Sequence, residues 1–337
     1  MITGDHPHTA SAIAQELGLP VGEGVFAGAD LDRLSDDELR KQVLKASVYA
    51  RVTAEHKLRI VRALKATNAV VAMTGDGVND APAIKGADIG IAMGITGTEV
   101  TKQASDMVIT DDNFATIVAA VEEGRGIYDN IRKTLQYLLA GNTAEILLMT
   151  FAVVAGFPAP LLPIHLLWIN LVTDGLPALC LATDPIDRDV MKHPPRSPSE
   201  QIMNRGFLGT MMVSGIIESG VAFAVYLSAL KTGGVEMART QAFTVIVFSE
   251  LLRSFGNRNT RKPLWRIPFL TNIPLIGVVL FSIGLQVLSH HNDLWGRFLK
   301  SAALPLGDTV RLFCLALVPL FCLEILKMVK TGDRKFR

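Results

Sequence analysis

The chain has 337 residues, of which 49% are hydrophobic and only 19% are charged. Soluble domains carry about 25% charged residues, so this composition favours a membrane protein, and the mean hydropathy of +0.34 agrees. The apolar content excludes a disordered chain. Lys and Arg total 33 against 32 Asp and Glu, a balance that gives no indication of a nucleic-acid partner.

The charges are distributed unevenly along the chain. Residues 1–134 hold 14 basic and 19 acidic side chains, whereas residues 135–337 hold 19 basic and 13 acidic ones. The first part is therefore expected to be an acidic soluble unit. The second is expected to be an apolar unit with basic connections.

Short β-rich runs alternate with helical patterns over the first 112 residues. We expect strands at 24–27, 47–52, 69–74, 89–93 and 107–110, and helices that include 8–17, 36–45 and 54–66. This alternation predicts a parallel sheet with helices on both faces. Ligands bind such sheets at the carboxyl ends of the strands, where the residues after 74 would lie.

From Phe114 to about Ala155 the pattern is helical, lacks proline and becomes steadily more apolar. Further apolar segments follow at 161–182, 207–230, 240–256, 269–289 and 308–328, each close to the length of a bilayer crossing. We therefore predict a stalk helix at 114–134, six transmembrane helices within 135–330 and a tail at 331–337. Basic residues concentrate at 184–206, at 257–268 and in the tail, so the positive-inside rule places the soluble unit and both termini in the cytoplasm.

The run Thr74-Gly75-Asp76-Gly77-Val78-Asn79-Asp80 follows a predicted strand. Its glycines allow a tight turn and close approach to a ligand, and Asp76 offers a hard oxygen ligand suited to Mg²⁺. Asn79 and Asp80 stand where a helix begins, near free amide donors. A capped strand-to-helix turn is the plainer interpretation, but the density of acidic and amide groups favours a functional site.

The order and spacing of two other soluble segments indicate that they are functional. Lys57 at the start of a helix could neutralise a phosphoryl oxygen, although a lone lysine there is more often solvated surface. Thr3-Gly4-Asp5 could be only a helix cap. Their combination with the run at 74–80 favours function over both plainer interpretations.

Polar side chains inside the apolar helices are informative, because an ionisable residue in hydrocarbon costs at least about 2.5 kcal/mol. Asn142 and Glu145 share one helix face, and Gly175 and Pro177 favour a local interruption after Asp174. With Asn170, Thr173 and Glu250 they offer enough oxygens for Ca²⁺, which takes about six to eight. We therefore predict a cation site of Asn142, Glu145, Asn170, Thr173, Asp174 and Glu250. The role of Glu218 stays open between helix packing and a polar contact.

Together these residues resemble the C-terminal part of a P-type ATPase, most closely the calcium pumps of the sarco/endoplasmic-reticulum type and their bacterial relatives. The resemblance spans nearly the whole chain. Its soluble signatures are Thr3-Gly4-Asp5, Lys57, the run at 74–80 and Asp111-Asp112-Asn113-Phe114, which is similar to the hinge into the stalk helix. Its membrane signatures are Asn142 with Glu145 and the run at 168–177.

The resemblance implies an α/β unit followed by an all-α membrane unit. Residues 1–113 would be the C-terminal part of a haloacid-dehalogenase-like (Rossmannoid) phosphorylation domain, ahead of the stalk and a six-helix transmembrane bundle. Asp76 would bind the catalytic Mg²⁺ with support from Asn79 and Asp80. The residues beside the phosphoryl group transferred from ATP would be Lys57, Thr3, Gly4 and Asp5.

For the transported cation, the resemblance implies Ca²⁺. A first site would consist of Asn142, Glu145, Thr173, Asp174 and Glu250. Asn170 and Asp174 would form part of a second site. Membrane lipid, the cation and the missing N-terminal part of the pump are the expected partners.

Several features of the family pattern do not occur in these 337 residues. There is no Asp-Lys-Thr-Gly-Thr motif to supply the phosphorylated aspartate, and His6 stands where family members have asparagine. The nucleotide-binding and actuator domains and the first four membrane helices are expected to be missing, as in a truncated or mis-started reading frame. We therefore expect the chain alone to be inactive.

Two other functions stay open at this stage. One is a non-catalytic membrane fragment or subunit that associates with another chain. The other, less favoured, is a membrane-anchored phosphatase, which needs an Asp-x-Asp nucleophile motif. Asp30-Leu31-Asp32 has these letters, but it follows Thr3-Gly4-Asp5 instead of preceding it.

Overall fold

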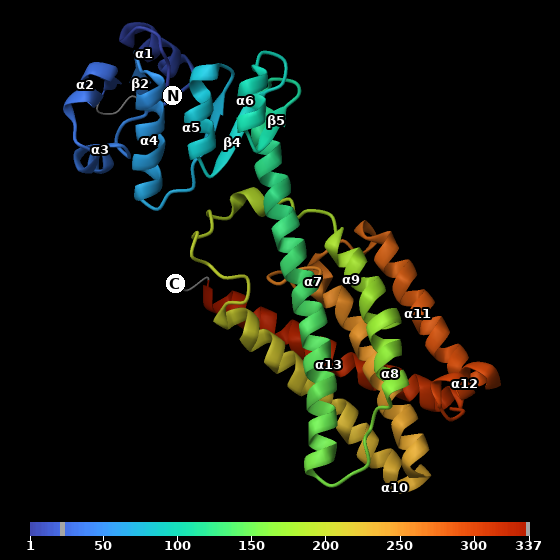
Figure 1. Ribbon diagram of the computed structural model, residues 1–337. Coiled ribbons are helices and arrows are strands. Elements are labelled where there is room, and N and C mark those ends of the chain that lie inside the picture. Colours follow the sequence, from blue (N-terminus) through green and yellow to red (C-terminus); the bar gives the residue numbers. More distant parts are fainter. Residues whose placement is uncertain (21–23, 335–337) are drawn as a thin grey trace. The chain divides into compact units, whose positions relative to one another are not determined.

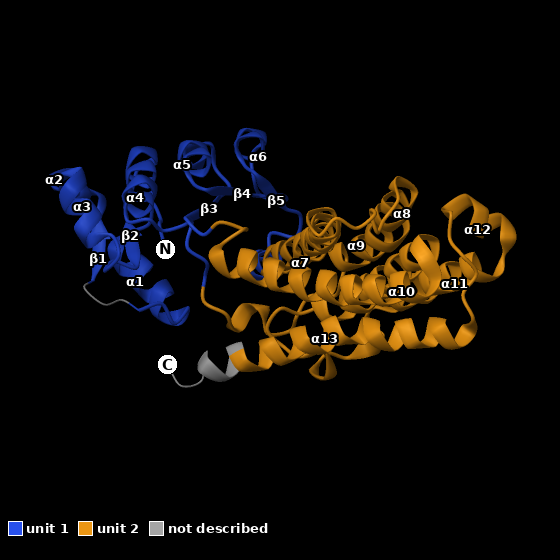
Figure 2. Cartoon of the chain, turned by 90° about the horizontal axis from the view of Figure 1, so that it is seen from below, with its two compact units in different colours: residues 1–121, 195–200 blue, residues 122–194, 201–337 orange. Residues whose placement is uncertain are grey.

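The computed structural model describes residues 1–20 and 24–334, with side chains through Val329. The end of the expected tail, residues 335–337, lies outside the described residues. The chain divides into two compact units: unit 1 is residues 1–121 with 195–200, and unit 2 is residues 122–194 with 201–337 (Figure 2). The division falls within the long helix α7 (Phe114–Val154).

Unit 1 is built from parallel strands, as the sequence predicts. Its described strands form two sheets, β1 (Val25–Ala27) with β2 (Val48–Ala50), and β3 (Ala72–Gly75), β4 (Ile89–Met93) and β5 (Met107–Ile109) in this order. The single sheet that the pattern predicts is thus divided in two. Beside β2, Ile2 pairs with Tyr49 by one isolated parallel bridge.

Helices pack on both faces of the sheet β1–β2, because successive side chains of a strand point to opposite faces. Val48 and Ala50 contact α1 (Pro7–Glu16), whereas Tyr49 between them belongs to the core with α3 (Asp36–Gln42) and α4 (Ala54–Ala66). The other helices of unit 1 are α2 (Gly28–Arg33), η1 (Val78–Asp80), α5 (Ala81–Gly86) and α6 (Glu99–Ala104).

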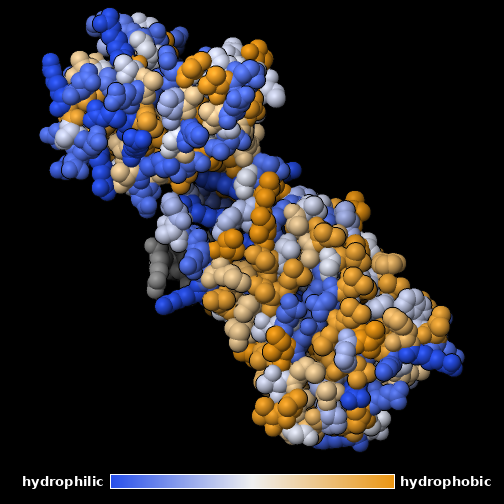
Figure 3. Space-filling model, in the orientation of Figure 1, coloured by the Kyte–Doolittle hydropathy of each residue, from blue (hydrophilic) through white to orange (hydrophobic). Residues whose placement is uncertain are grey.

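Unit 2 is a helical bundle (Figure 1). After α7 it contains α8 (Pro163–Trp168), η2 (Ile169–Asp174), α9 (Gly175–Ala182), η3 (Val190–Lys192), α10 (Arg205–Asn257), η4 (Leu264–Arg266), η5 (Phe269–Thr271), α11 (Ile273–His291), α12 (Asp293–Leu299) and α13 (Leu306–Arg334). Hydrophobic residues dominate its visible surface, whereas unit 1 exposes many hydrophilic ones (Figure 3). Large apolar side chains such as Val154, Leu171 and Leu280 are more than 60% exposed, as expected of a surface that contacts lipid.

Five helices among the described residues are long and apolar enough to cross a membrane, whereas the sequence predicts six crossings. The difference arises in α10, which combines the predicted spans 207–230 and 240–256 in one element of 53 residues. A straight helix of this length would extend about 80 Å, far more than a bilayer core of about 30 Å.

The chain reverses inside α10 at Gly234, whose φ of 80° is a conformation that L-residues other than glycine rarely adopt. Tyr226 and Ala229 before the glycine pack against Ala238 and Ala242 after it. Further along, Glu218 and Arg253 form an ion pair, although 35 residues would separate them by about 50 Å in a straight helix. The two halves of α10 therefore lie side by side.

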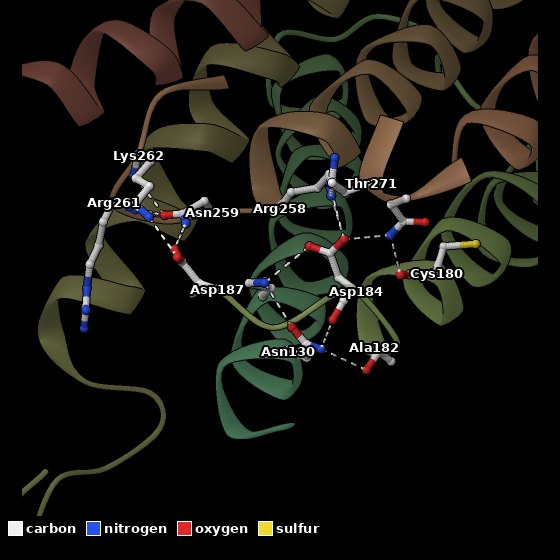
Figure 4. Close-up of polar contacts among 12 residues, drawn as sticks. Asn130, Cys180, Ala182, Asp184, Asp187, Arg258, Asn259, Arg261, Lys262 and Thr271 are labelled. Atoms are coloured by element: carbon white, nitrogen blue, oxygen red, sulfur yellow. Dashed lines mark hydrogen bonds and ion pairs between the residues drawn. The ribbon is translucent and has the colours of Figure 1, made fainter. Parts of the chain in front are cut away.

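A buried network around Asp184 fastens the ends of the helices together (Figure 4). Asn130 of α7 donates to the Asp184 carbonyl at 2.7 Å, and Lys133 forms an ion pair with its carboxylate at 3.4 Å. Arg258 and Asn272 donate to the same carboxylate at 3.0 and 2.8 Å. One aspartate after α9 thus connects α7, the end of α10 and the start of α11.

Candidate functional site

A pocket of about 600 Å³ lies in unit 1 at the carboxyl ends of β3 and β4. This is the edge of a parallel sheet at which ligands bind. Its lining includes Thr3, Gly4, Lys57, Thr74, Gly75, Asp76, Asp80, Thr96, Asp112 and Phe114. Segments far apart in the sequence, the N-terminus, the start of α4 and the loop after β3, therefore meet in one pocket.

The turn after β3 requires glycine because Asp80 lies against it. A Cβ atom on Gly75 would approach the Asp80 Cγ and Oδ2 atoms to 2.7 Å. Asp80 is buried; it accepts a hydrogen bond from the Gly77 amide at 3.2 Å and forms an ion pair with Lys57. Thr53 caps α4 by accepting from the His56 amide, which places Lys57 in the first turn of that helix.

The carboxylate of Asp76, unlike that of Asp80, is available to coordinate a metal ion. Its side chain is exposed, lines the pocket and has no hydrogen bond to any residue in the described part of the chain. Its backbone carbonyl accepts hydrogen bonds from the Thr98 amide at 2.9 Å and from the Thr101 hydroxyl at 3.3 Å. A free carboxylate beside a polar pocket fits the coordination chemistry of Mg²⁺, which prefers oxygen ligands and retains several waters.

Not all predicted residues of unit 1 line this pocket. Asn79 is exposed and lies outside the lining. Asp5 is exposed as well, and its carboxylate accepts a hydrogen bond from the Thr3 hydroxyl at 2.7 Å. Thr3 and Gly4 do line the pocket. Asp5 is therefore connected to the pocket by its hydrogen bond with Thr3.

Asp112 is a pocket residue whose role the sequence analysis did not assign. Its carboxylate accepts hydrogen bonds from the amides of Gly94, Ile95 and Thr96 at 2.7, 3.0 and 2.8 Å, and from the Thr96 hydroxyl at 2.8 Å. These hydrogen bonds, led by that from the Ile95 amide, lower the pKa of Asp112 to about 2. The sequence signal that could have indicated this role is the glycine-rich loop directly after β4, whose amides need an acceptor.

The Asp-x-Asp letters at 30–32 do not form a nucleophile site. Asp30 and Asp32 lie in α2. Asp30 accepts a hydrogen bond from the Ala27 amide at 3.0 Å, and Asp32 contacts His56 Nε2 at 2.7 Å. Neither residue lines the pocket. The membrane-anchored phosphatase therefore loses the motif that it needs.

Buried carboxylates of the helical bundle include Glu145, Asp174, Glu218 and Glu250, each no more than 6% exposed. Both carboxylate oxygens of Asp174, of Glu218 and of Glu250 have no hydrogen bond. Oxygens of Asp174 and Glu250 face the same point beside Gly141 of α7. Buried polar atoms nearly always have partners, so such a cluster requires an explanation, for which an ion is one candidate.

Gly141 of α7 shows how closely these side chains converge. A Cβ atom at this position would lie 2.9 Å from Glu250 Oε1 and 3.4 Å from Asp174 Oδ2. It would also lie 3.2 Å from Nη2 of Arg253. Side chains from η2 and α10 therefore meet against one point of α7 that has no side chain of its own.

The interruption that the sequence predicts near Asp174 takes the form of the π-helical segment η2. Such segments are rare and are frequent at functional sites. Thr173 is buried there; its hydroxyl donates to the Ile169 carbonyl at 2.8 Å, and its own carbonyl accepts from the Tyr137 hydroxyl at 2.7 Å. The backbone is thus widened where the carboxylate of Asp174 enters the bundle.

The two amides of the predicted cation site are less enclosed. Asn142 is half-buried on α7. Asn170 is exposed, and its side-chain amide donates to the Leu166 carbonyl at 2.8 Å. No group of three or more His, Cys, Asp or Glu side chains among the described residues is arranged to hold a metal ion.

Arg253 is the second residue that the sequence analysis did not assign. It is 1% exposed, and its Nε lies 3.2 Å from Glu218 Oε2 in an ion pair. The contact gives Glu218 the polar role that sequence reasoning left open. An arginine three residues after Glu250 in an apolar helix was the available signal.

Comparison with known proteins reveals the family. Residues 158–329, more than half of the chain, match the family described as cation transporting ATPase, C-terminus. The chain belongs to the cation-transporting P-type ATPases. Residues 1–88 match the haloacid dehalogenase-like hydrolases, in agreement with the fold class expected for unit 1.

Three relatives of this P-type ATPase chain are calcium-transporting ATPases by name. It is 46% identical over 327 residues to the calcium-transporting ATPase of Bacillus subtilis, an alignment that covers 96% of this chain and 36% of the relative. Calcium-transporting ATPase 1 of Bacillus cereus is 42% identical over 98% of this chain and 39% of the relative. Calcium-transporting ATPase type 2C member 1 of Pongo abelii is 37% identical, with 100% and 37% covered. The chain thus spans less than two fifths of these relatives.

The Asp112 carboxylate predicts a pH-dependent loop in unit 1. Its ordinary pKa of 3.8 falls to about 2 in the folded protein, so its stabilising effect is complete above pH 3.8 and is lost as the pH falls through 2. Hydrogen exchange of the amides at 94–96, corrected for intrinsic rates, should accelerate over that interval. Asp112→Asn keeps a residue that tolerates the positive φ at this position but cannot accept all four hydrogen bonds. Its loop should exchange at least about tenfold faster at neutral pH, and unchanged protection would contradict the assignment.

Proposed function

We propose that this chain is the C-terminal part of a Ca²⁺-transporting P-type ATPase. It would contribute the Mg²⁺- and phosphoryl-stabilising side of the phosphorylation site and most of the transported-ion site. The observation that carries this proposal is the pair of buried carboxylates, Asp174 and Glu250, whose four oxygens have no hydrogen bond. Two such groups are expensive to bury unless a cation compensates them.

The chemistry of the donors favours calcium over other cations. Glu145, Asp174 and Glu250 are hard oxygen donors, and the Thr173 and Asn142 side chains add neutral oxygens on the same helices. Three carboxylates around one Ca²⁺ leave a net charge of −1 when all are ionised, whereas a monovalent ion leaves −2. Mg²⁺ is less suited because it dehydrates reluctantly. The relatives' names support the same ion.

In unit 1, Asp76 would hold Mg²⁺, which supplies positive charge against the phosphoryl oxygens when it is bound. Lys57 would direct its ammonium group toward the same oxygens, and Asp80 would keep it in place through their ion pair. Gly75 leaves room for close approach, and Thr3 and Gly4 close another side of the pocket. The phosphorylated aspartate and the ATP-binding domain would come from the missing part of the pump.

Radiolabelled Ca²⁺ binding to the purified 337-residue chain in lipid nanodiscs tests the proposal. We expect one weak, saturable site, and Asp174→Asn should weaken it by at least about tenfold because it removes a charged ligand. Glu236→Gln, which neutralises an exposed carboxylate of α10, is the matched control and should bind normally. Incubation of the same preparation with labelled ATP should give no acid-stable phosphoenzyme. Absence of saturable binding, or equal binding by Asp174→Asn, would contradict the calcium site.

We further propose six membrane crossings, with unit 1 and both termini in the cytoplasm. The reversal at Gly234 supports two crossings within α10, and the basic residues at 184–206 and 257–268 support the orientation. Reporters fused after Gly156, Thr232 and Asp293 should lie on the far side, and those after Arg196 and Arg258 in the cytoplasm. A far-side result after Arg258 would show that α10 crosses only once.

A further inference from the structure

Arg253 carries a permanent positive charge into the cluster that we assign to the cation. Its guanidinium stays ionised even when buried, and its Nη2 shares the space beside Gly141 with Glu250 and Asp174. We infer that Glu218 is a positioning residue that holds Arg253 away from Asp174 and Glu250, and so leaves those carboxylates free for the transported cation. This inference rests on the proposed function.

Three contacts hold the guanidinium on one side of the cluster. Nε lies 3.2 Å from Glu218 Oε2, and Nη1 donates to the Tyr137 carbonyl at 3.2 Å. The Cζ atom lies 5.1 Å from the centre of the Tyr137 ring, which provides a cation–π contact. Of these partners, only Glu218 contributes a full opposite charge.

The contacts that Arg253 does not make are equally important. Among the described residues, Glu218 is the carboxylate with which Arg253 forms an ion pair, and neither Asp174 nor Glu250 forms one. Nη2 has no hydrogen bond, although it and Glu250 Oε1 face the same point at Gly141. A small movement of the guanidinium would therefore bring it to the unpaired carboxylates.

A tethered guanidinium in that position would compete with the transported ion. An intramolecular group acts at an effective concentration that free Ca²⁺ does not reach, in the millimolar range even for flexible tethers. The counter-charge of Glu218 balances this attraction, and the reversal of α10 at Gly234 brings Glu218 beside Arg253. The pair thus tunes the affinity of the site without either residue having to bind the ion.

A double-mutant cycle on Ca²⁺ binding separates this role from the alternatives. Glu218→Gln should weaken radiolabelled Ca²⁺ binding by about tenfold or more, because the released guanidinium pairs with Asp174 and Glu250. Glu218→Gln combined with Arg253→Gln should return the affinity to within about threefold of the unmodified chain. If Glu218 were itself a Ca²⁺ ligand, the double variant would stay weak.

The control variant is Glu324→Gln, which removes a buried carboxylate from another ion pair of unit 2, that with Lys327. Its Ca²⁺ affinity should not change. If Glu218→Gln does not fold, Glu218→Asp retains the charge with a shorter reach and should show a smaller loss that Arg253→Gln also reverses.

The outcomes distinguish failure of the positioning role of Glu218 from failure of the cation site. Normal binding by Glu218→Gln, or a double variant as weak as the single one, overturns the positioning role and leaves the cation site in place. An unmodified chain that binds no Ca²⁺ overturns both the cation site and the positioning role. The inference is supported only if Glu218→Gln weakens Ca²⁺ binding and the double variant recovers the Ca²⁺ affinity.

Discussion

Burial of charge inside apolar helices is the constraint on which unit 2 depends. Glu145, Asp174, Glu218, Glu250 and Arg253 are each no more than 6% exposed, and the ion pair of Glu218 with Arg253 compensates only part of their charge. Removing ions from water costs several kcal/mol each, even after the structure relaxes. Such a cluster calls for a compensating charge, and we propose a divalent cation for Asp174 and Glu250, whose oxygens have neither a hydrogen bond nor an ion pair among the described residues.

The surrounding elements bring the charged side chains of that cluster together. Gly141 removes a side chain at the point where the charges meet, η2 widens the backbone beside Asp174, and Gly234 reverses α10 so that both of its halves contribute. At the ends of the helices, Asp184 is bound by Asn130 of α7, by Arg258 directly after α10 and by Asn272 directly before α11. A movement of α7, the helix that continues into unit 1, would therefore displace residues of both the charged cluster at Gly141 and the network around Asp184.

Much of this arrangement could be predicted from the sequence, because it depends on local patterns. The parallel strands, the extent of α7 and the positions of Asp76 and Lys57 follow from periodicity, glycine placement and capping. The division into two sheets, the partners of Asp112 and Arg253 and the outward position of Asn170 could not be predicted. Each depends on which distant segment lies opposite: the Gly94 loop for Asp112, Glu218 for Arg253, and the orientation of η2 for Asn170.

We infer that an ion lies between Asp174 and Glu250 while Arg253 stays paired with Glu218. The most direct measurement is anomalous diffraction from crystals of the chain grown with Sr²⁺, which replaces Ca²⁺ and scatters strongly at its absorption edge. We expect an anomalous peak within coordination distance of Asp174 and Glu250 next to Gly141, with the guanidinium of Arg253 still paired with Glu218. A map without a peak there, or with the guanidinium between the two carboxylates, would contradict it.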